Sequence, residues 1–174
     1  MKILEIRRHS IRAQPGNHLN QQGVTLARSV GQAIGPFGRV VTSTLSRAFE
    51  TAIAMGFAVD EQNELMSTYG GLVGREAPWP MPFYHYSEVV KRNGAAAAYA
   101  NQLADYYAQV MSMIADGEAA LAINHGGVVE LGVAVCLPNE DFLPWGDEVG
   151  YCEGARLFWE YGKFIRGEVL RVGK

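Results

Sequence analysis

Short apolar runs alternate along the chain with longer segments in which apolar residues recur at helical spacing. The run from Ile3 to Ile6 predicts a strand at about 2–7, and the spacing over 24–34 predicts a helix that ends at Gly35-Pro36. The same patterns predict strands at 39–43 and 119–123, helices that begin at 46 and cover 87–115 and 128–136, and a terminal hairpin at 156–161 and 164–172. Strands that alternate with helices predict an α/β fold, a three-layer αβα sandwich with a mostly parallel central sheet.

The two helices nearest the N-terminus begin at residues that can accept hydrogen bonds from backbone N–H groups. Asn20 is placed to cap the first, and Ser43, Thr44 or Ser46 to cap the second. Arg47 would then lie in the first turn of the second helix, where unpaired N–H groups also attract anions.

Glycine, proline and aromatic residues gather in the middle of the chain, from about 59 to 86. Tyr69-Gly70-Gly71 and the proline-rich stretch 78–84 are typical of irregular structure. The helical pattern that follows is expected to break at Asn93-Gly94. We therefore expect a single domain, 1–174, in which a cap or inserted region at about 59–95 covers the functional site and determines its substrate.

Composition narrows the classes of partner. The formal net charge of -3 and the pI near 5.8 argue against a nucleic-acid or membrane-surface binder, since either calls for a broad basic field. Cys136 and Cys152 are too few for a disulfide framework or a zinc cluster, so they are expected to be reduced packing residues. The start of the chain lacks a secretory apolar region, and we expect a cytoplasmic protein.

Two predicted strands end in histidines that are accompanied by polar or basic residues. His9 follows Arg8 at the end of the first strand, and His125 follows Asn124 after the strand at 119–123. Ligands of open α/β sheets bind at the carboxyl ends of the strands, so we expect both imidazoles to face the ligand-binding edge of the sheet. A neutral imidazole can accept a phosphoryl group, and guanidinium groups such as those of Arg12 and Arg47 can bind it in bidentate fashion.

These motifs resemble the histidine phosphatase superfamily, which includes phosphoglycerate mutases and acid phosphatases. The resemblance runs from residue 2 to about 136 and implies a phosphoglycerate mutase-like fold. It implies that His9 becomes phosphorylated and that Arg8, Arg47 and His125 complete the phosphate pocket. Arg12 matches a further arginine of some branches. The matching segments are Arg8-His9-x-x-Arg12, Leu19-Asn20-Gln21-Gln22-Gly23, Ser46-Arg47-Ala48 with Thr51-Ala52, and Asn124-His125-Gly126-Gly127.

The chain departs from the family pattern at two places. Ser10 stands where the family usually has glycine, and Gly126 stands where some branches have the aspartate that protonates the leaving group. The other family option is a glutamate after the second strand and helix. Glu64 is our choice for this proton donor, and Glu61 and Glu76 stay as alternatives.

The function expected from these residues is hydrolysis of a small phosphomonoester without metal or other cofactor, with Arg12, Ser10 and Gly126 contacting the substrate. A second possibility is mutase-like phosphotransfer, and a third is a binding module that holds a phosphorylated ligand or phosphate with little turnover. No metal-ligand spacing is present in the sequence. We expect no nucleic-acid or membrane partner, and either a monomer or a homodimer.

Overall fold

The computed structural model describes residues 1–173 and contains a six-stranded sheet in the order β3-β2-β4-β1-β5-β6. Four neighbouring strands are parallel: β1 (Lys2–Arg8), β2 (Arg39–Thr42), β3 (Glu61–Gln62) and β4 (Ala119–Asn124). The antiparallel strands β5 (Gly154–Glu160) and β6 (Lys163–Leu170) extend the sheet beyond β1. The mostly parallel α/β sheet predicted from the alternating pattern is therefore confirmed.

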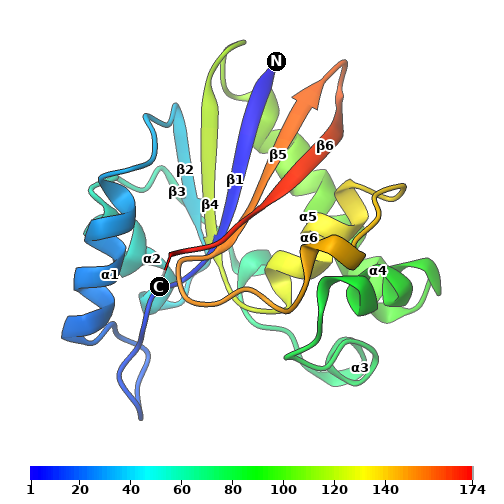
Figure 1. Ribbon diagram of the computed structural model, residues 1–174, viewed down its shortest axis with the longest axis horizontal. Helices are drawn as coiled ribbons and strands as arrows, with labels where there is room; N and C mark the ends of the chain where they lie inside the picture. Colours follow the sequence, from blue (N-terminus) through cyan, green and yellow to red (C-terminus); the bar gives the residue numbers. More distant parts are fainter. Residues whose placement is uncertain (174) are drawn as a thin grey trace.

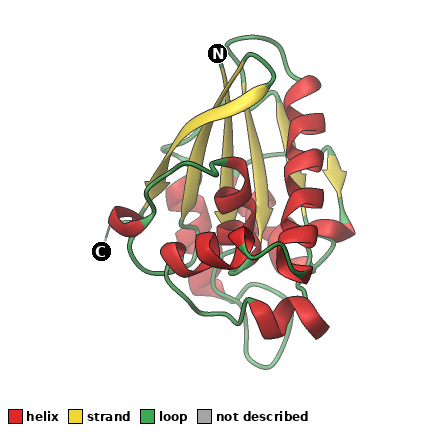
Figure 2. Cartoon of the chain, turned by 90° about the vertical axis from the view of Figure 1, so that its right-hand side faces the viewer, coloured by secondary structure: helices red, strands yellow, loops and turns green. Residues whose placement is uncertain are grey.

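Helices cover both faces of this sheet, as Figure 1 shows. On one face lie α1 (Gln21–Gly31) and α2 (Ser46–Met55), and on the other lie α5 (Ala95–Ser112) and α6 (Val128–Cys136). The shorter α3 (Gly71–Glu76) packs against α5, and α4 (Phe83–Lys91) packs against α6; short 3-10 turns occur at Glu64–Met66 and Leu143–Trp145. In Figure 2, the long α5 stands alongside the strands, and shorter helices gather around their lower ends. Within residues 1–173, no helix combines the length and apolar character needed to span a bilayer.

Strand β4 is the centre of the core because its side chains are buried on both faces. Ala120 and Ala122 pack into the cluster formed with α5 and α6. Leu121 and Ile123, which point the other way, pack against α1 and α2. This two-sided burial explains why β4 is a continuous apolar run rather than an alternating one.

The pairing of β1 with β4 places the site. Arg8 is in register with Asn124, and the next residue on each strand is a histidine. The backbone N–H of His9 donates to the carbonyl of Asn124 at 2.9 Å, which extends the ladder beyond the last paired residues. Two residues 116 positions apart in sequence (125 − 9) thus emerge side by side at the carboxyl edge of the sheet.

One of the two predicted helix caps is confirmed. The side chain of Asn20 accepts a hydrogen bond from the Gly23 N–H at 2.8 Å and caps α1. The prediction for α2 is wrong, because its N-cap residue is Leu45, which makes no side-chain capping bond. The Ser43 and Thr44 hydroxyls bond to His125 and Glu64 instead. Tertiary contacts therefore take up two hydroxyls that a local pattern assigns to capping.

The region at 59–95 contains more regular structure than its composition predicts. Helix α3 begins at Gly71, where two glycines predicted a turn, and α4 begins at Phe83, four residues before the expected start. Proline precedes Phe83, and Phe83 itself is fully buried, so the tertiary contact extends the helix toward the proline. The predicted break at Asn93-Gly94 is confirmed, with Asn93 in the left-handed region at φ 55°.

The C-terminal hairpin is also confirmed, with boundaries shifted by one or two residues. Its turn is Tyr161-Gly162, where both residues have positive φ values, 52° and 77°. That backbone twist matches the right-handed twist of the flanking strands. The hairpin places β6 at one edge of the sheet, away from the ends of β1 and β4.

Candidate active site

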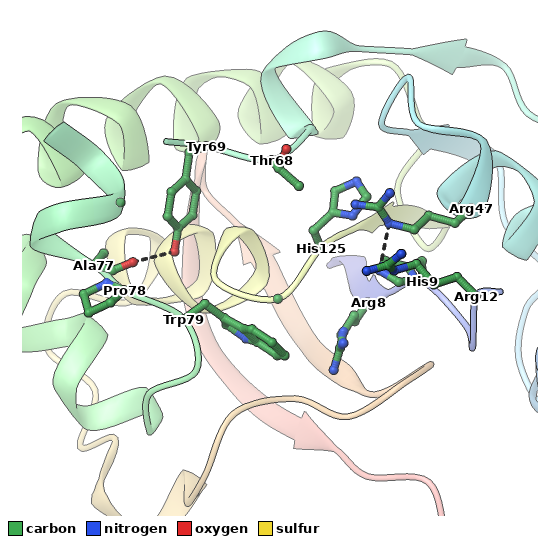
Figure 3. A pocket seen from close by; sticks show the side chains of 12 residues that line it. Arg8, His9, Arg12, Arg47, Thr68, Tyr69, Ala77, Pro78, Trp79 and His125 are labelled. Carbon is green, nitrogen blue, oxygen red and sulfur yellow. Dashed lines mark hydrogen bonds between the residues drawn. The ribbon is translucent and has the colours of Figure 1, made fainter. Parts of the chain in front are cut away.

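His9 and His125 form the floor of a pocket of about 310 Å³ at the carboxyl edge of the sheet. Their ring centroids are 5.1 Å apart, and the rings are tilted by 55°. Both side chains are buried, with exposed fractions of 4% and 3%. Figure 3 shows the two imidazoles facing the same cavity as Arg8, Arg12 and Arg47, with Tyr69 and Trp79 on the opposite side.

A backbone contact determines which nitrogen of His9 is available for chemistry. His9 Nδ1 lies 2.7 Å from the carbonyl oxygen of Ser10. A carbonyl oxygen only accepts hydrogen bonds, so Nδ1 carries the proton and donates it. Nε2 is left with its lone pair, and it accepts a hydrogen bond from Arg47 Nε at 3.1 Å. The nitrogen with the free lone pair thus faces the guanidinium of Arg47.

The surroundings of His9 also keep the imidazole neutral. Burial, followed by the charges of Arg47, Arg8 and Arg12, lowers its pKa to about 3, although the Ser10 carbonyl acts in the opposite direction. Lowering of the pKa means that the ring stays unprotonated at neutral pH. An unprotonated imidazole is the form that can attack phosphorus.

His125 is held by a hydroxyl that the sequence did not mark as functional. Its Nε2 lies 2.7 Å from the Oγ of Ser43, which follows directly after β2. Burial, and then the neighbouring His9 and arginines, lowers the pKa of His125 to about 2. Ser43 is a polar residue just after the end of β2, which pairs with β4, and this position was the signal that could have identified it. The sequence interpretation assigned its hydroxyl to helix capping instead.

Two of the arginines reach the pocket from a helix and from a loop. Arg47, in the first turn of α2 as predicted, also donates through Nη1 to Asn17 Oδ1 at 2.8 Å. Arg12 donates to the carbonyl of Gly16 at 2.8 Å, in the loop between β1 and α1. Both guanidinium groups keep donors free to face a ligand, because each has five N–H bonds.

Arg8 lies against two aromatic rings. Its guanidinium carbon lies 4.6 Å from the ring centroid of Trp79 and 4.3 Å from that of Tyr151. Arg8 Nη1 also donates to the carbonyl of Val149 at 3.1 Å. These contacts together restrain the guanidinium in the wall of the pocket. Nothing in the local sequence around Tyr151 indicated this role.

Among residues 1–173, two buried polar atoms that lack hydrogen-bond partners belong to side chains that line this pocket. They are Arg8 Nε and His125 Nδ1. A buried donor without a partner costs about 1–3 kcal/mol, so folded proteins seldom keep one without a reason. Burial is the largest cause that lowers the pKa of Arg8 and of Arg47, and the mutual repulsion of the arginines, including Arg12, adds to it. An anion would satisfy both the unpaired atoms and the crowded positive charge.

The predicted contact of Ser10 with substrate is not what the structure shows. The Ser10 side chain is fully buried, and its hydroxyl donates to the carbonyl of Gly23 at 2.7 Å. Its backbone N–H donates to Thr51 Oγ1 at 2.9 Å, which ties the loop to α2. A Cβ on Gly23 would collide with the backbone of Ile11, so glycine is required there. Ser10 therefore secures the loop after His9 to the start of α1.

Gly126 and Gly127 are the place where the cap region meets the floor. A Cβ on Gly126 would overlap the indole of Trp79, and one on Gly127 would overlap the hydroxyl end of Tyr69. Gly127 also has φ 83°, a conformation that side chains rarely adopt. The position at which some branches of the superfamily have an acidic residue is thus occupied by the approach of Trp79.

None of the three glutamates considered as proton donors lines the pocket described within residues 1–173. Glu64 is exposed, and its carboxylate accepts hydrogen bonds from Thr44 and Ser67. Glu61 pairs with Arg39 and Tyr106; although burial acts to raise its pKa, those bonds hold the pKa below its usual value. Glu76 accepts from the N–H groups of Ala96 and Ala95 at the start of α5, which lower its pKa.

Glu130 is a buried carboxyl group that sequence reasoning did not single out. Its two oxygens accept from the backbone N–H groups of Gly127 at 2.6 Å and Val149 at 2.9 Å. Burial raises its pKa to about 7. Val149 also accepts from Arg8, so Glu130 links the loop after His125 to the segment that holds Arg8.

The described residues contain no group of three His, Cys, Asp or Glu side chains arranged to hold a metal ion. The pocket is instead lined by three arginines, and guanidinium groups bind anions such as phosphate in bidentate fashion.

Comparison with known proteins gives likeness in structure but not in sequence. No protein-family model matches the sequence, and no curated protein matches it in sequence. A phosphoserine phosphatase from Entamoeba histolytica, solved with 3-phosphoglyceric acid, superposes with a TM-score of 0.72 over 99% of this chain and 98% of its own, at 16% identity. A mycobacterial glucosyl-3-phosphoglycerate phosphatase, solved with VO3, gives a TM-score of 0.66 over 99% and 100%, at 18% identity. The chain therefore has the α/β fold of these phosphatases, as its resemblance to the histidine phosphatase superfamily implies.

Proposed function

We propose that this protein is a metal-independent histidine phosphatase that hydrolyses small phosphomonoesters through a phosphohistidine at His9. The observation that carries the proposal is the state of His9. Its Nδ1 proton is committed to the Ser10 carbonyl, and its Nε2 lone pair faces Arg47 in a pocket with two further cations. The names of the two similar structures, both phosphatases, support the same reaction class.

In the first step, the phosphate group replaces the Arg47–His9 contact and is bound by Arg8, Arg12 and Arg47. The Nε2 lone pair attacks phosphorus as the bond from phosphorus to the ester oxygen breaks, and the electron pair of that bond leaves on the ester oxygen, which becomes the alcohol or phenol product when it gains a proton. Arg8 Nε is buried without a partner among the described residues and is available to donate to the equatorial oxygens; so is His125 Nδ1 in the tautomer in which Ser43 donates to Nε2. Since those oxygens carry the negative charge of the transition state, preorganised donors lower the barrier.

In the second step, water attacks the phosphohistidine and the bond from nitrogen to phosphorus breaks. The electron pair returns to Nε2, and inorganic phosphate leaves the pocket. The Ser10 carbonyl holds Nδ1–H through both steps, so the ring keeps its tautomer and orientation. Hydrolysis rather than transfer to a second substrate is favoured by the small volume of the pocket, about 310 Å³.

The test is phosphate release from 4-nitrophenyl phosphate in the presence of a chelator, together with acid quenching to trap the phosphorylated enzyme. We expect the wild type to turn over and to carry acid-labile phosphate. His9→Ala should lose activity by about 10⁴-fold or more, the scale seen when other enzymes lose their nucleophile.

His85→Ala is the matched control, since His85 is an exposed histidine on α4 outside the pocket. It should keep wild-type activity. Loss of activity with the chelator would contradict the metal-independent mechanism. Binding of phosphate or vanadate without any turnover would instead support a binding module with the same pocket.

A further inference from the structure

Among residues 1–173, none of the twelve residues that line the cavity of the two histidines is an aspartate or a glutamate. Phosphatases that release an alcohol benefit from a proton donor at the leaving oxygen, which typically contributes 10²- to 10⁴-fold in rate. The question is therefore whether any group near this pocket can supply that proton.

The other titratable side chains of the wall are poorly suited to the task. Tyr69 donates its hydroxyl to the carbonyl of Ala77 at 2.9 Å, and burial raises its pKa to about 12. The neutral ring of His125 carries no second proton to give. The guanidinium groups keep their protons at all accessible pH values.

The carboxyl groups of Glu64, Glu130 and Glu148 do not line the pocket. Glu130 has the raised pKa of an acid catalyst, but its side chain is completely buried and both of its oxygens accept backbone N–H bonds. Glu64 accepts hydrogen bonds from the hydroxyls of Thr44 and Ser67, and the charge of Glu148 acts on Arg8 from outside the lining. The space that an acidic side chain at Gly126 would occupy is filled by the indole of Trp79.

Without a proton donor, the leaving group must depart as an anion, and its basicity then limits the rate. An alkoxide is almost as basic as hydroxide, whose conjugate acid, water, has a pKa of about 15.7. A phenolate is far less basic, since a phenol such as tyrosine has a pKa of about 10. Phenolic esters can therefore be cleaved without protonation, whereas alkyl esters are cleaved slowly.

The wall opposite the phosphate-binding groups suits an aromatic leaving group. Trp79 stacks on Arg8 with one part of its surface and is 41% exposed. Tyr69 lies on the same side of the pocket, as Figure 3 shows, and its hydroxyl end approaches Gly127. Thr68, Ala77 and Pro78 complete an uncharged surface. A ring bound there gains dispersion and edge-to-face contacts, and no buried charge is left without a partner.

On the basis of the function proposed above, we infer that this site is specialised for aryl phosphates, whose phenolate leaves without being protonated by the enzyme. His9 Nε2 forms its bond to phosphorus while the bond from phosphorus to the phenolic oxygen breaks. The electron pair stays on that oxygen, which takes a proton from water after release. Water then cleaves the phosphohistidine, its proton passes to solvent, and phosphate is the second product.

The experiment compares kcat/KM for a series of leaving groups on the intact protein. The probes are 4-nitrophenyl phosphate, 4-chlorophenyl phosphate, phenyl phosphate and 4-methoxyphenyl phosphate, with phosphoserine and 3-phosphoglycerate as alkyl esters. We expect kcat/KM to fall steadily as the basicity of the leaving phenolate rises, and to be lower for the alkyl esters than for phenyl phosphate by about 10²- to 10⁴-fold.

A flat dependence, or alkyl esters cleaved within about tenfold of phenyl phosphate, overturns the inference and leaves the phosphatase function intact. Absence of turnover and of phosphohistidine with every ester overturns both. The two failures are thus distinguished by the aryl substrates alone.

Glu64→Gln is the second variant, because Glu64 is the glutamate nearest in sequence to the pocket wall at Thr68. We expect the ratio of aryl to alkyl kcat/KM to stay within about threefold of the wild-type ratio. Selective loss of alkyl ester cleavage in Glu64→Gln would identify it as a proton donor and overturn the inference. Glu50→Gln is the matched control for loss of an acidic side chain from the neighbouring surface, since Glu50 binds the Leu19 N–H outside the pocket.

Discussion

The pocket has two walls that differ in origin and in chemistry. The floor, defined by Arg8, His9, Arg47 and His125, comes from strand ends and the first turn of α2. The roof, defined by Thr68, Tyr69 and Trp79, comes from the cap region at 59–95. The floor is charged, and backbone carbonyls and neighbouring side chains orient several of its groups. The roof is uncharged, and its indole is partly exposed.

In the reaction proposed above, this difference divides the work between the two walls. The floor would bind and transfer the phosphoryl group, a task that is the same for every ester. The roof contacts the part of the substrate that varies from one ester to another. Function often varies in loops that a rigid scaffold positions, and here the loops supply only aromatic and small side chains. The two walls meet at Gly126 and Gly127, so changes at these glycines affect both.

The largest effect is expected from removal of a floor cation. Arg47→Gln deletes the donor to His9 Nε2 and one of three positive charges of the pocket. We expect kcat/KM to fall by about 10²- to 10³-fold for every ester alike, because the phosphoryl group is common to all. Steady-state kinetics with the aryl series measures this. Arg28→Gln, which changes an exposed arginine on α1, is the control and should have no effect. A selective effect on one leaving group would contradict the division between floor and roof.

A smaller effect is expected where the roof meets the floor. Gly126→Ala places a methyl group inside the indole of Trp79, which must move away from Arg8. We expect kcat/KM to fall by about tenfold to 10²-fold, the scale of a displacement near 1 Å. Combining it with Trp79→Ala removes the collision, so the double variant should be no worse than Trp79→Ala alone. Gly74→Ala, at a lining glycine with open space around it, should be silent. Additive losses in the double variant would show that Gly126 acts independently of Trp79.

The smallest effect is expected for pH, because neither His9 nor His125 should change its protonation state. The lowered pKa values of His9, about 3, and His125, about 2, mean that both rings stay neutral between about pH 5 and pH 8. Acidification over this range should therefore leave the ring C–H resonances of both histidines unchanged in NMR spectra. Assignment uses His9→Ala. A midpoint near 6.5 for His9 would mean that burial and the arginines do not control its charge.

The sequence predicted the floor better than the roof. His9 and His125 lie at the ends of apolar runs, and strand ends in an α/β sheet meet at one edge because parallel pairing is the usual outcome of alternating strands and helices. Arg47 lies in the first turn of α2, which follows β2, so it too is placed at the carboxyl edge of the sheet. The prediction for Ser10 was wrong because a residue's position next to His9 does not show which way its side chain points. Only the tertiary structure shows that the Ser10 hydroxyl points into the protein and donates to the Gly23 carbonyl.

What the sequence determined by itself is the order of strands and helices and the identity of the groups at the strand ends, since both depend on local periodicity and short motifs. Tertiary structure alone decided how the irregular segment 59–95 folds over those groups. The stacking of Trp79 and Tyr151 on Arg8 joins residues 72 positions apart (151 − 79), and no periodic signal records such a contact. The commitment of each glutamate to another partner was likewise invisible, because a carboxylate's neighbours are determined by packing and not by its position in the chain.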